Sequence, residues 1–487
     1  MAGFNKVRRH DVAINSYEGG AVYEKSPINE WVNILFSSFL ENGFYESALD
    51  QQERFIKLTD LIAEKYGYEF VAKASIFARN ELGMRSISQL VAAWLNDKSF
   101  ENKRLFYRNF MHRPDDVAEI FAAIDYLNGK RSHALIRGAA DYLSGLSAQT
   151  LAKYKLNSRD YNMYDLINIT HAYSKHINDY KNNCLEKADT WEVNISTAKS
   201  VEEKNAEWRR LVETGKIGYM ALIRNLNNIL DSGVNQEWIN DHLIPLITDK
   251  KRIKNSLIFP YRFFTAYKNL QVHNLEIDNA LGKAFITAAI HNAPQLDGPS
   301  AIILDVSGSM TDRISYNSNI TLKEIGACFA ISLVLSNPDC LLVKFGNDAK
   351  YFKCNILDNP FVLIENFCKN DNCGCGTYII PAFEKIGMTD YKKLKRIFLI
   401  SDMQVMDSGS FDFYNRWQDS ATKFYNRMFK NVPLYSFDLG NYHTQIKTSN
   451  DPNIHYITAL NDQVFKFIGL LESNINLVDY INTFNYY

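Results

Sequence analysis

The hydrophobic pattern of the sequence changes near residues 292–300, and this change is the strongest constraint on the fold. Before it, apolar residues recur at helical spacing, whereas after it short β-rich runs alternate with helical stretches. The two patterns bury different kinds of surface, so they predict two units of different class. We therefore expect an α-helical unit over residues 1–295 and an α/β unit over residues 296–487.

The first unit consists of short amphipathic segments. Residues 51–67 place Phe55, Leu58 and Ile62 on one face, and a second such segment follows directly after Gly67. Similar segments continue to residue 293. Because each is too short to bury its own apolar face, we expect neighbouring helices to stack as in HEAT-like α-solenoid repeats. The pattern has no strict period, so a compact all-α domain is the alternative.

In the second unit, predicted strands alternate with predicted helices. The strands are expected at residues 300–305, 340–346, 349–357, 396–402, 433–439 and 454–460. This alternation predicts a doubly wound, Rossmann-like parallel sheet with helices on both faces. Ligands of such sheets bind beyond the carboxyl ends of the strands, where Asp305 and Asp402 are expected to lie.

Composition limits the functional classes. With 46% hydrophobic and 22% charged residues, the chain can bury a large core. Its N-terminal segment lacks the apolar stretch of a signal peptide, and no later run approaches the roughly 18 apolar residues of a membrane span, so we expect a cytoplasmic protein without membrane contact. Seven irregularly spaced cysteines favour neither a disulfide framework nor a zinc site. A net charge of −1 means that nucleic-acid binding would need a local basic patch.

The stretch SAIILDVSGSM, residues 300–310, ends a predicted buried strand with one carboxylate and two hydroxyls. These belong to Asp305, Ser307 and Ser309, and two later segments offer Thr377 before a helix and Asp402 at the end of a strand. One interpretation is an ordinary Asp/Ser/Gly turn. The other is a divalent-cation site, because Mg²⁺ takes hard oxygen ligands.

The pattern D-x-S-x-S resembles the metal-ion-dependent adhesion site (MIDAS) of von Willebrand factor A domains, which also draws a Thr and an Asp from two later loops. The resemblance implies a cation, Mg²⁺ or Mn²⁺, held by Asp305, Ser307, Ser309, Thr377 and Asp402. It also implies an acidic protein ligand, or another anionic group, at the open coordination position. The chain departs from the family at Tyr378, where an acidic residue is frequent.

Catalytic motifs are missing from the sequence. The serines of this segment do not lie in a G-x-S-x-G elbow, and there is no G-x-x-x-x-G-K-[ST] phosphate loop. A hydrolytic metal centre would need a general base and usually a second metal, and neither is evident. We therefore expect a binding protein and no enzyme.

The resemblance extends over most of the chain, to the TROVE family typified by the Ro ribonucleoprotein autoantigen and its bacterial relatives. The matching segments are SYEGGAVYEKSP, KYKLNSRDYNMYDLINITHAYS, GYMALIRNLNNIL, IFPYRFFTAYK and LDVSGSM. The resemblance implies a ring of helical repeats whose ends are brought together by the von Willebrand factor A domain, and hence a monomer. It also implies RNA partners, namely single-stranded ends of misfolded RNA in the ring and small noncoding, Y-like RNA on its outer surface.

The candidate RNA-binding residues lie in one region of the helical unit. Four match the family segment after a one-residue shift: Lys153, Lys155, Arg159 and His171. Arg131 and Arg137 precede them, and tyrosines interleave, which would place phosphate contacts beside stacking surfaces. The alternative is a solvated helix face. A second basic cluster, residues 250–254, either lines the ring or forms a solvated loop.

We therefore predict a non-catalytic RNA-binding ring protein that serves as a ribonucleoprotein scaffold or RNA quality-control factor. The alternative is a cation-dependent protein-interaction or structural module, for example of a phage or mobile element, that has kept the fold without RNA binding. The near-neutral net charge leaves this alternative open, because strong binding of a structured RNA needs several cations in one place.

Overall fold

The computed structural model carries all 487 residues and shows helices in the first half and a sheet with covering helices in the second. The residues it describes are 13–15, 21–24, 27–37, 48–154, 156, 159–185, 190–314, 318–403, 421–429, 431–440, 444–445, 454–457, 464–472 and 477–486. Within these parts of the chain, none of the helices combines the length and apolar character that crossing a membrane requires.

The helical half follows the predicted succession of short helices. Among the described residues, its first ten α-helices are α1 (Pro27–Ser37), α2 (Ala48–Tyr66), α3 (Tyr68–Asn80), α4 (Ser86–Trp94), α5 (Lys103–Phe110), α6 (Pro114–Tyr126), α7 (His133–Ser144), α8 (Ala148–Lys153), α9 (Met163–Thr170) and α10 (Lys175–Lys181). The next nine are α11 (Trp191–Thr197), α12 (Val201–Glu213), α13 (Tyr219–Arg224), α14 (Leu226–Leu230), α15 (Gln236–Trp238), α16 (Ile244–Ile247), α17 (Lys250–Ser256), α18 (Tyr261–Lys268) and α19 (Leu275–Asn292).

Local signals in the sequence explain many of the helix ends. Gly67 separates α2 from α3 with a φ of 85°, a left-handed conformation that glycine adopts readily. The side chain of Ser132 accepts a hydrogen bond from the backbone N–H of Leu135 at the start of α7. Asn162 and Asp165 form a reciprocal capping box at the start of α9. These caps fix where each short helix begins, and packing between neighbours then buries the apolar faces.

The described residues of the second half form a six-stranded sheet. Its strands are β3 (Ser300–Asp305), β4 (Cys340–Phe345), β5 (Ala349–Phe352), β6 (Arg396–Ser401), β7 (Leu434–Asp438) and β9 (Ile454–Ile457). The order is β5-β4-β3-β6-β7-β9, with β5 antiparallel and the other neighbours parallel. The helices are α20 (Leu322–Ser336), α21 (Pro360–Cys368), α22 (Ile379–Gly387), α23 (Ala421–Phe429), α24 (Val464–Glu472) and α25 (Leu477–Thr483). The predicted mainly parallel α/β architecture is confirmed, with an antiparallel edge strand added.

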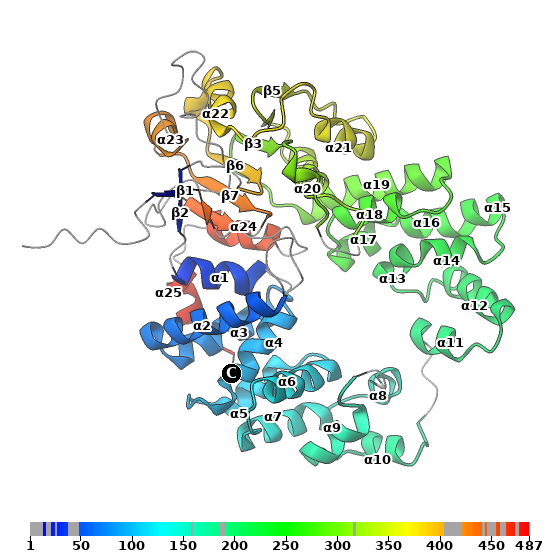
Figure 1. Cartoon of the computed structure of the whole chain (residues 1–487). Coiled ribbons are helices and arrows are strands. Elements are labelled where there is room, and N and C mark those ends of the chain that lie inside the picture. The colour runs from blue at the N-terminus through cyan, green and yellow to red at the C-terminus, as the bar shows by residue number, and fades with distance from the viewer. Residues whose placement is uncertain are drawn as a thin grey trace, which may run out of the picture.

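The two halves are joined at both ends of the helical arc (Figure 1). Helix α19 packs against α20, which covers the sheet, while α1 contacts β9 and α3 contacts α25. The helices between them follow one another along a curved path that leads away from the sheet and back to it. This arrangement is the predicted helical ring joined to an α/β unit, and it differs from the compact all-α alternative.

Two strand pairings were not predicted, one local and one between distant segments. Strands β1 (Ala13–Asn15) and β2 (Ala21–Glu24) form an antiparallel hairpin, and β2 pairs with β8 (Thr444–Gln445). The early hairpin therefore joins a small sheet with a strand from the second half. The domain boundary predicted between residues 295 and 296 stays a prediction, because segments from both sides of it pack against one another.

Candidate functional site

The acidic residues of the predicted cation site lie at one edge of the large sheet. Strand β3 ends at Asp305, and the neighbouring parallel strand β6 ends at Ser401, directly before Asp402. Asp305 has 0% and Asp402 1% of its surface exposed. The carboxyl ends of adjacent parallel strands coincide, which explains how residues almost a hundred positions apart come together.

Hydrogen bonds orient both oxygens of the Asp305 carboxylate. The backbone N–H of Ser307 donates to Oδ1 at 2.8 Å, and the Ser401 hydroxyl donates to Oδ2 at 2.7 Å. The hydroxyl oxygens of Ser307 and Ser309 lie 3.3 Å apart. The turn interpretation of the sequence is thus correct for the backbone of this segment, and the turn gathers the two hydroxyls beside a buried carboxylate.

The loop that carries Thr377 reaches the same edge of the sheet. The backbone N–H of Gly308 donates to the carbonyl of Cys375 at 3.2 Å, and the amide of Asn370 donates to the carbonyl of Val306 at 3.2 Å. Thr377 itself is buried. The structure therefore brings the Thr377 loop against the Ser307–Ser309 turn, as the sequence prediction required.

Residues that the sequence interpretation missed support this loop. Asn347 accepts the backbone N–H of Gly376 at 2.5 Å, and Asn370 accepts that of Gly374 at 3.1 Å. A Cβ on Gly346 would lie 2.4 Å from the carbonyl oxygen of Gly374, so only glycine permits this approach. The Asn and Gly content of the segment KNDNCGCGT was the available signal, because these residues favour tight turns.

A buried lysine holds the beginning of the same loop. Lys344, on β4, is almost fully buried and donates to the carbonyls of Asn366 at 3.1 Å and Lys369 at 2.9 Å. Its ammonium group also pairs with Asp371. Charge-assisted hydrogen bonds of this kind are stronger than neutral ones. Lys344 therefore fixes where the chain leaves α21 and turns toward Thr377.

The electrostatics of the edge favour a cation. Burial, together with the charge of nearby Asp402, raises the pKa of Asp305 to about 7. A divalent cation would relieve the repulsion between the two carboxylates, and carboxylate and hydroxyl oxygens are suitable ligands for Mg²⁺. The donor set thus fits the predicted metal. Within the described residues, including this site with its two carboxylates, no cluster of three or more His, Cys, Asp or Glu side chains is arranged to hold a metal.

The candidate RNA-binding residues lie on the helical half, around α6 to α9. Arg131 forms an ion pair with Asp125 at 2.7 Å, and its guanidinium lies 4.8 Å from the ring of Phe121 and 5.0 Å from that of Tyr161. Arg131 therefore contacts two aromatic rings. Its charge already faces a carboxylate.

Two further predicted cations are also paired with acids. Arg159 pairs with Glu119 of α6, and Lys153 at the end of α8 pairs with Glu192 of α11 at 2.8 Å. In Figure 1, α8 and α11 lie near one another in the helical arc, as this ion pair requires. RNA phosphates would have to compete with these carboxylates, because each pair already neutralises its cation.

His171 and Arg137 are exposed, and Lys155 lies outside the described residues. His171 ends α9 with a φ of 56°. Two residues later, Tyr173 has 79% of its surface exposed, and its backbone N–H donates to the hydroxyl of Ser144 at 3.1 Å. An exposed ring on a fixed backbone beside a histidine is suited to stacking with a base.

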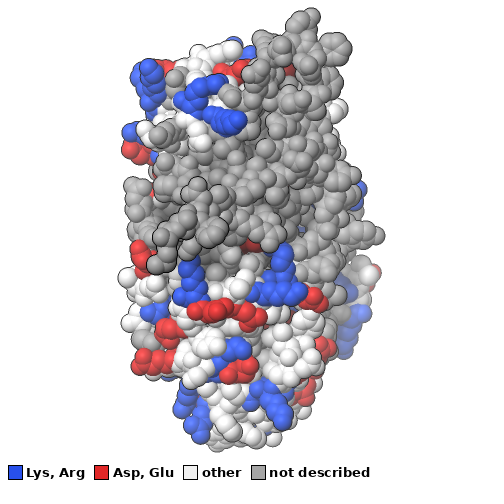
Figure 2. Space-filling model, turned by 60° about the vertical axis from the view of Figure 1, so that its left-hand side comes forward, with Lys and Arg blue, Asp and Glu red and all other residues white. Residues whose placement is uncertain are grey.

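Charges of both signs are interspersed over the part of the surface that Figure 2 shows in colour. Lys and Arg side chains alternate there with Asp and Glu side chains, so this face has no large field of one sign. The mixture agrees with the net charge of −1. A nucleic acid would therefore be bound by local groups of cations, as expected from the composition.

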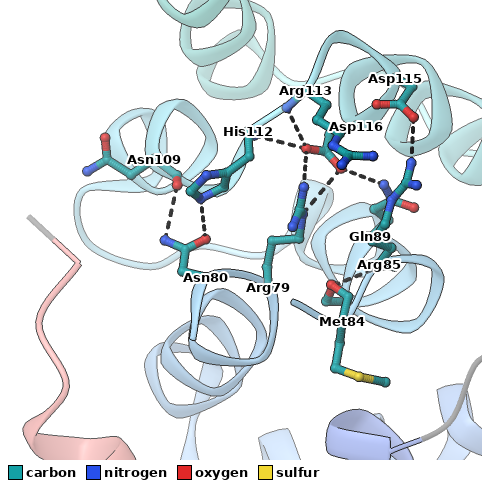
Figure 3. Close-up of polar contacts among 11 residues, drawn as sticks. Arg79, Asn80, Met84, Arg85, Gln89, Asn109, His112, Arg113, Asp115 and Asp116 are labelled. Atoms are coloured by element: carbon teal, nitrogen blue, oxygen red, sulfur yellow. Dashed lines mark hydrogen bonds and ion pairs between the residues drawn. The ribbon is translucent and has the colours of Figure 1, made fainter. Parts of the chain in front are cut away.

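A buried polar cluster anchors the helix that carries Glu119 and Asp125 (Figure 3). Asp116, in the first turn of α6, accepts hydrogen bonds from Arg79 of α3 and from Gln89 of α4. Beside it, Asp115 pairs with Arg85. These contacts hold α6 against the two preceding helices and so set the position of its acidic side chains.

Comparison with known proteins adds to this geometry. The TROVE domain profile matches residues 180–298. Telomerase protein component 1 of Rattus norvegicus and of Mus musculus is 29% identical over 86 residues, which are 18% of this chain and 3% of each relative. The chain thus spans only a small part of the length of these two relatives.

The crystal structure of the Deinococcus radiodurans Ro (RSR) protein resembles most of the chain. The superposition has a TM-score of 0.66 at 14% sequence identity and covers 92% of this chain and 100% of the other. The shared architecture includes both the helical arc and the α/β unit. The chain therefore carries a match to the TROVE domain over residues 180–298 and shares its overall fold with this Ro protein.

Proposed function

We propose that this protein binds RNA without catalysing a reaction, as a ribonucleoprotein scaffold or RNA quality-control factor. The observation that carries the proposal is the TROVE profile match within a chain whose whole fold is that of a Ro protein. The local similarity to a component of telomerase supports the same class of function. The RNA would be a small noncoding RNA or the single-stranded end of a misfolded RNA.

The proposed contacts are the cations and aromatic rings around α6 to α9. Lys153, Arg131 and Arg159 would exchange their carboxylate partners for phosphates, while Arg137 and His171 are already exposed. Such exchange is feasible because surface ion pairs contribute only about 0–1 kcal/mol each. Tyr173 would stack with an unpaired base.

RNA capture by the purified full-length protein tests this proposal. Bound RNA is crosslinked and sequenced for the wild type and for a Lys153→Gln/His171→Ala variant. A Lys204→Gln/His291→Ala variant serves as control, because it changes the same residue types at exposed positions of other helices. We expect a defined RNA or single-stranded 3′ ends with the wild type and the control only. Equal recovery from all three proteins would disprove the assigned surface, and background RNA alone would disprove RNA binding.

We also propose that the edge formed by β3, β6 and the Thr377 loop is a von Willebrand factor A-type site for Mg²⁺, with Mn²⁺ as the other candidate. The hydroxyls of Ser307, Ser309 and Thr377 and the carboxylates of Asp305 and Asp402 would hold the ion. The bound cation would supply an attachment point for an anionic partner. The two buried, mutually repelling carboxylates are the observation that favours this site.

Thermal unfolding with MgCl₂ and with EDTA tests the cation site. Mg²⁺ at about 100 times its dissociation constant would stabilise the wild type by about 2.7 kcal/mol. The Ser309→Ala variant should lose this stabilisation. The control is Thr311→Ala, which removes a hydroxyl from the next turn that bonds to the Gly308 carbonyl. The proposal fails if Mg²⁺ does not stabilise the wild type, or if it stabilises all three proteins equally.

A second candidate function is Mg²⁺-dependent binding of an acidic protein. It is supported by the buried carboxylates of Asp305 and Asp402 and by the hydroxyls of Ser307 and Ser309, whose oxygens lie 3.3 Å apart in the turn after β3. A protein complex that survives RNase treatment but dissociates in EDTA would support it. The same complex formed equally by Ser309→Ala would contradict it.

A further inference from the structure

The second basic cluster of the sequence forms an exposed face of α17. Lys254 follows Lys250 by four residues and Lys251 by three, so the three side chains lie on one side of the helix. All three residues are exposed, whereas Ile253, which lies between Lys251 and Lys254 in the sequence, is fully buried. The sequence alone left open whether this segment was a solvated loop. The structure makes it a helix with one basic side.

The backbone under this face is held firmly. The carboxylate of Asp249 accepts the backbone N–H groups of Lys251 at 2.8 Å and Arg252 at 3.0 Å. The Arg252 side chain turns away from the lysines, donates to the carbonyl of Ile217 and lies 6.0 Å from the ring of Tyr219. Asp249 and Arg252, the charged neighbours of the lysines in sequence, are therefore engaged in structural contacts. The three lysines are presented on a fixed support.

These lysines differ from the cations around α6 to α9 in having no acidic partner. Within the described ranges, none of the three ammonium groups forms a salt bridge, whereas Arg131, Arg159 and Lys153 each do. Like charges four residues apart destabilise a helix slightly. Their grouping on α17 therefore does not serve the stability of the helix. It leaves three positive charges available to an external anion.

Adjacent α13, which packs against α17, carries a further exposed cation, Arg224. A row of cations without carboxylate partners is suited to a ligand with a row of negative charges. The phosphodiester backbone of RNA is such a ligand, since each nucleotide adds one charge along the strand. A single small anion would engage one or two of the lysines and leave the others unused.

We infer that the exposed face of α17, formed by Lys250, Lys251 and Lys254, is a second RNA-binding surface that contacts the phosphate backbone independently of base sequence. The inference rests on the proposed RNA-binding function but concerns a different surface. Because its cations need no exchange of partners, this face would take the larger share of non-specific affinity. The paired cations around α6 to α9 would then select the RNA that displaces their carboxylates.

The salt dependence of RNA binding tests this inference. The probe is a fluorescein-labelled single-stranded 20-mer of uridine, and the proteins are full-length. The Lys250→Gln/Lys251→Gln/Lys254→Gln variant is compared with the wild type by fluorescence anisotropy between 50 and 200 mM NaCl. The control variant, Lys57→Gln/Lys65→Gln/Lys204→Gln, removes the same charge from exposed positions on α2 and α12. Replacing the three α17 lysines with arginine gives a second variant, which keeps the charge.

Each cation that meets a phosphate of single-stranded RNA makes the plot of log K against log salt steeper by about 0.7, so the loss of three cations makes it shallower by about 2. The wild-type affinity should then fall about 20-fold more than that of the glutamine variant over this salt range. The control and the arginine variant should behave like the wild type. Equal slopes for wild type and glutamine variant would overturn this surface and leave the proposed function standing. Absence of wild-type binding would overturn both.

Discussion

Replacing Asp116 with alanine should destabilise the helical half more than any surface substitution. The two carboxylate oxygens of Asp116 accept five hydrogen bonds (Figure 3). Arg79 donates at 3.2 and 2.8 Å and Gln89 at 2.7 Å, while the backbone N–H groups of His112 and Arg113 donate at 2.9 Å each. The carboxylate is thus shared by three helices and the turn before α6.

The magnitude follows from what the substitution leaves behind. The Arg79 residue is 7% exposed, so its guanidinium would stay buried without its carboxylate. Removing one partner of a buried ion pair destabilises a protein by about 3–5 kcal/mol. The matched control is Asp115→Ala. Its partner Arg85 has a side chain that is 40% exposed and can be hydrated, so we expect a loss of about 1 kcal/mol.

Urea unfolding followed by far-ultraviolet circular dichroism measures the difference. The first transition of Asp116→Ala should shift to lower urea by an amount equivalent to about 3–5 kcal/mol, and that of Asp115→Ala by about 1 kcal/mol. If the two variants lose the same stability, the buried pair is not the anchor of α6 and the reasoning is refuted.

Three further predictions follow from other contacts. Burial opposes ionisation of Asp116, but Arg79 and the backbone donors outweigh burial and hold the pKa of Asp116 below its usual range. The ionised carboxylate therefore stabilises the fold above about pH 4, and this stabilisation is lost as the pH falls further. Thermal melting from pH 5 to pH 2.5 should show a steeper loss of stability for the wild type than for Asp116→Asn. Gly346→Ala should displace the Thr377 loop, lower the free energy of unfolding by about 1–3 kcal/mol and abolish stabilisation by Mg²⁺. Melting temperatures equal to those of the wild type, with and without Mg²⁺, would contradict this. Tyr486→Ala should lower the free energy of unfolding by about 3 kcal/mol, because the buried ring contacts Phe106 and its hydroxyl donates to Glu69. An unchanged melting temperature would show that this contact does not hold the two halves together.

The sequence alone predicted many of the helices, the six strands of the large sheet and the carboxylates of the candidate cation site. Apolar residues at helical spacing and the capping residues before them are local signals, and they are sufficient for helices such as α2, α3 and α7. Asp305 and Asp402 could be assigned to one sheet edge because parallel strands align their carboxyl ends. The resemblance to the TROVE family supplied the ring.

Contacts between residues that are distant in the sequence could not be predicted from these local signals. Ser401 completes the hydrogen bonds of Asp305, which precedes it by 96 positions, and Lys344 supports the Thr377 loop from a neighbouring strand. Neither residue belongs to the sequence motif. Their roles depend on strand order and on the path of a loop, and both of these are set by packing across the whole α/β unit.

The same distinction applies to charge. The sequence identified the cations around α6 to α9 and the cluster at residues 250–254 equally well, because charge is a local property. Only the tertiary structure showed that Arg159 lies against Glu119, forty residues away, while the lysines of α17 have no such partner within the described chain. A cation's availability depends on which carboxylate the fold places within a few ångströms, since the Coulomb interaction depends on distance in space and not along the chain.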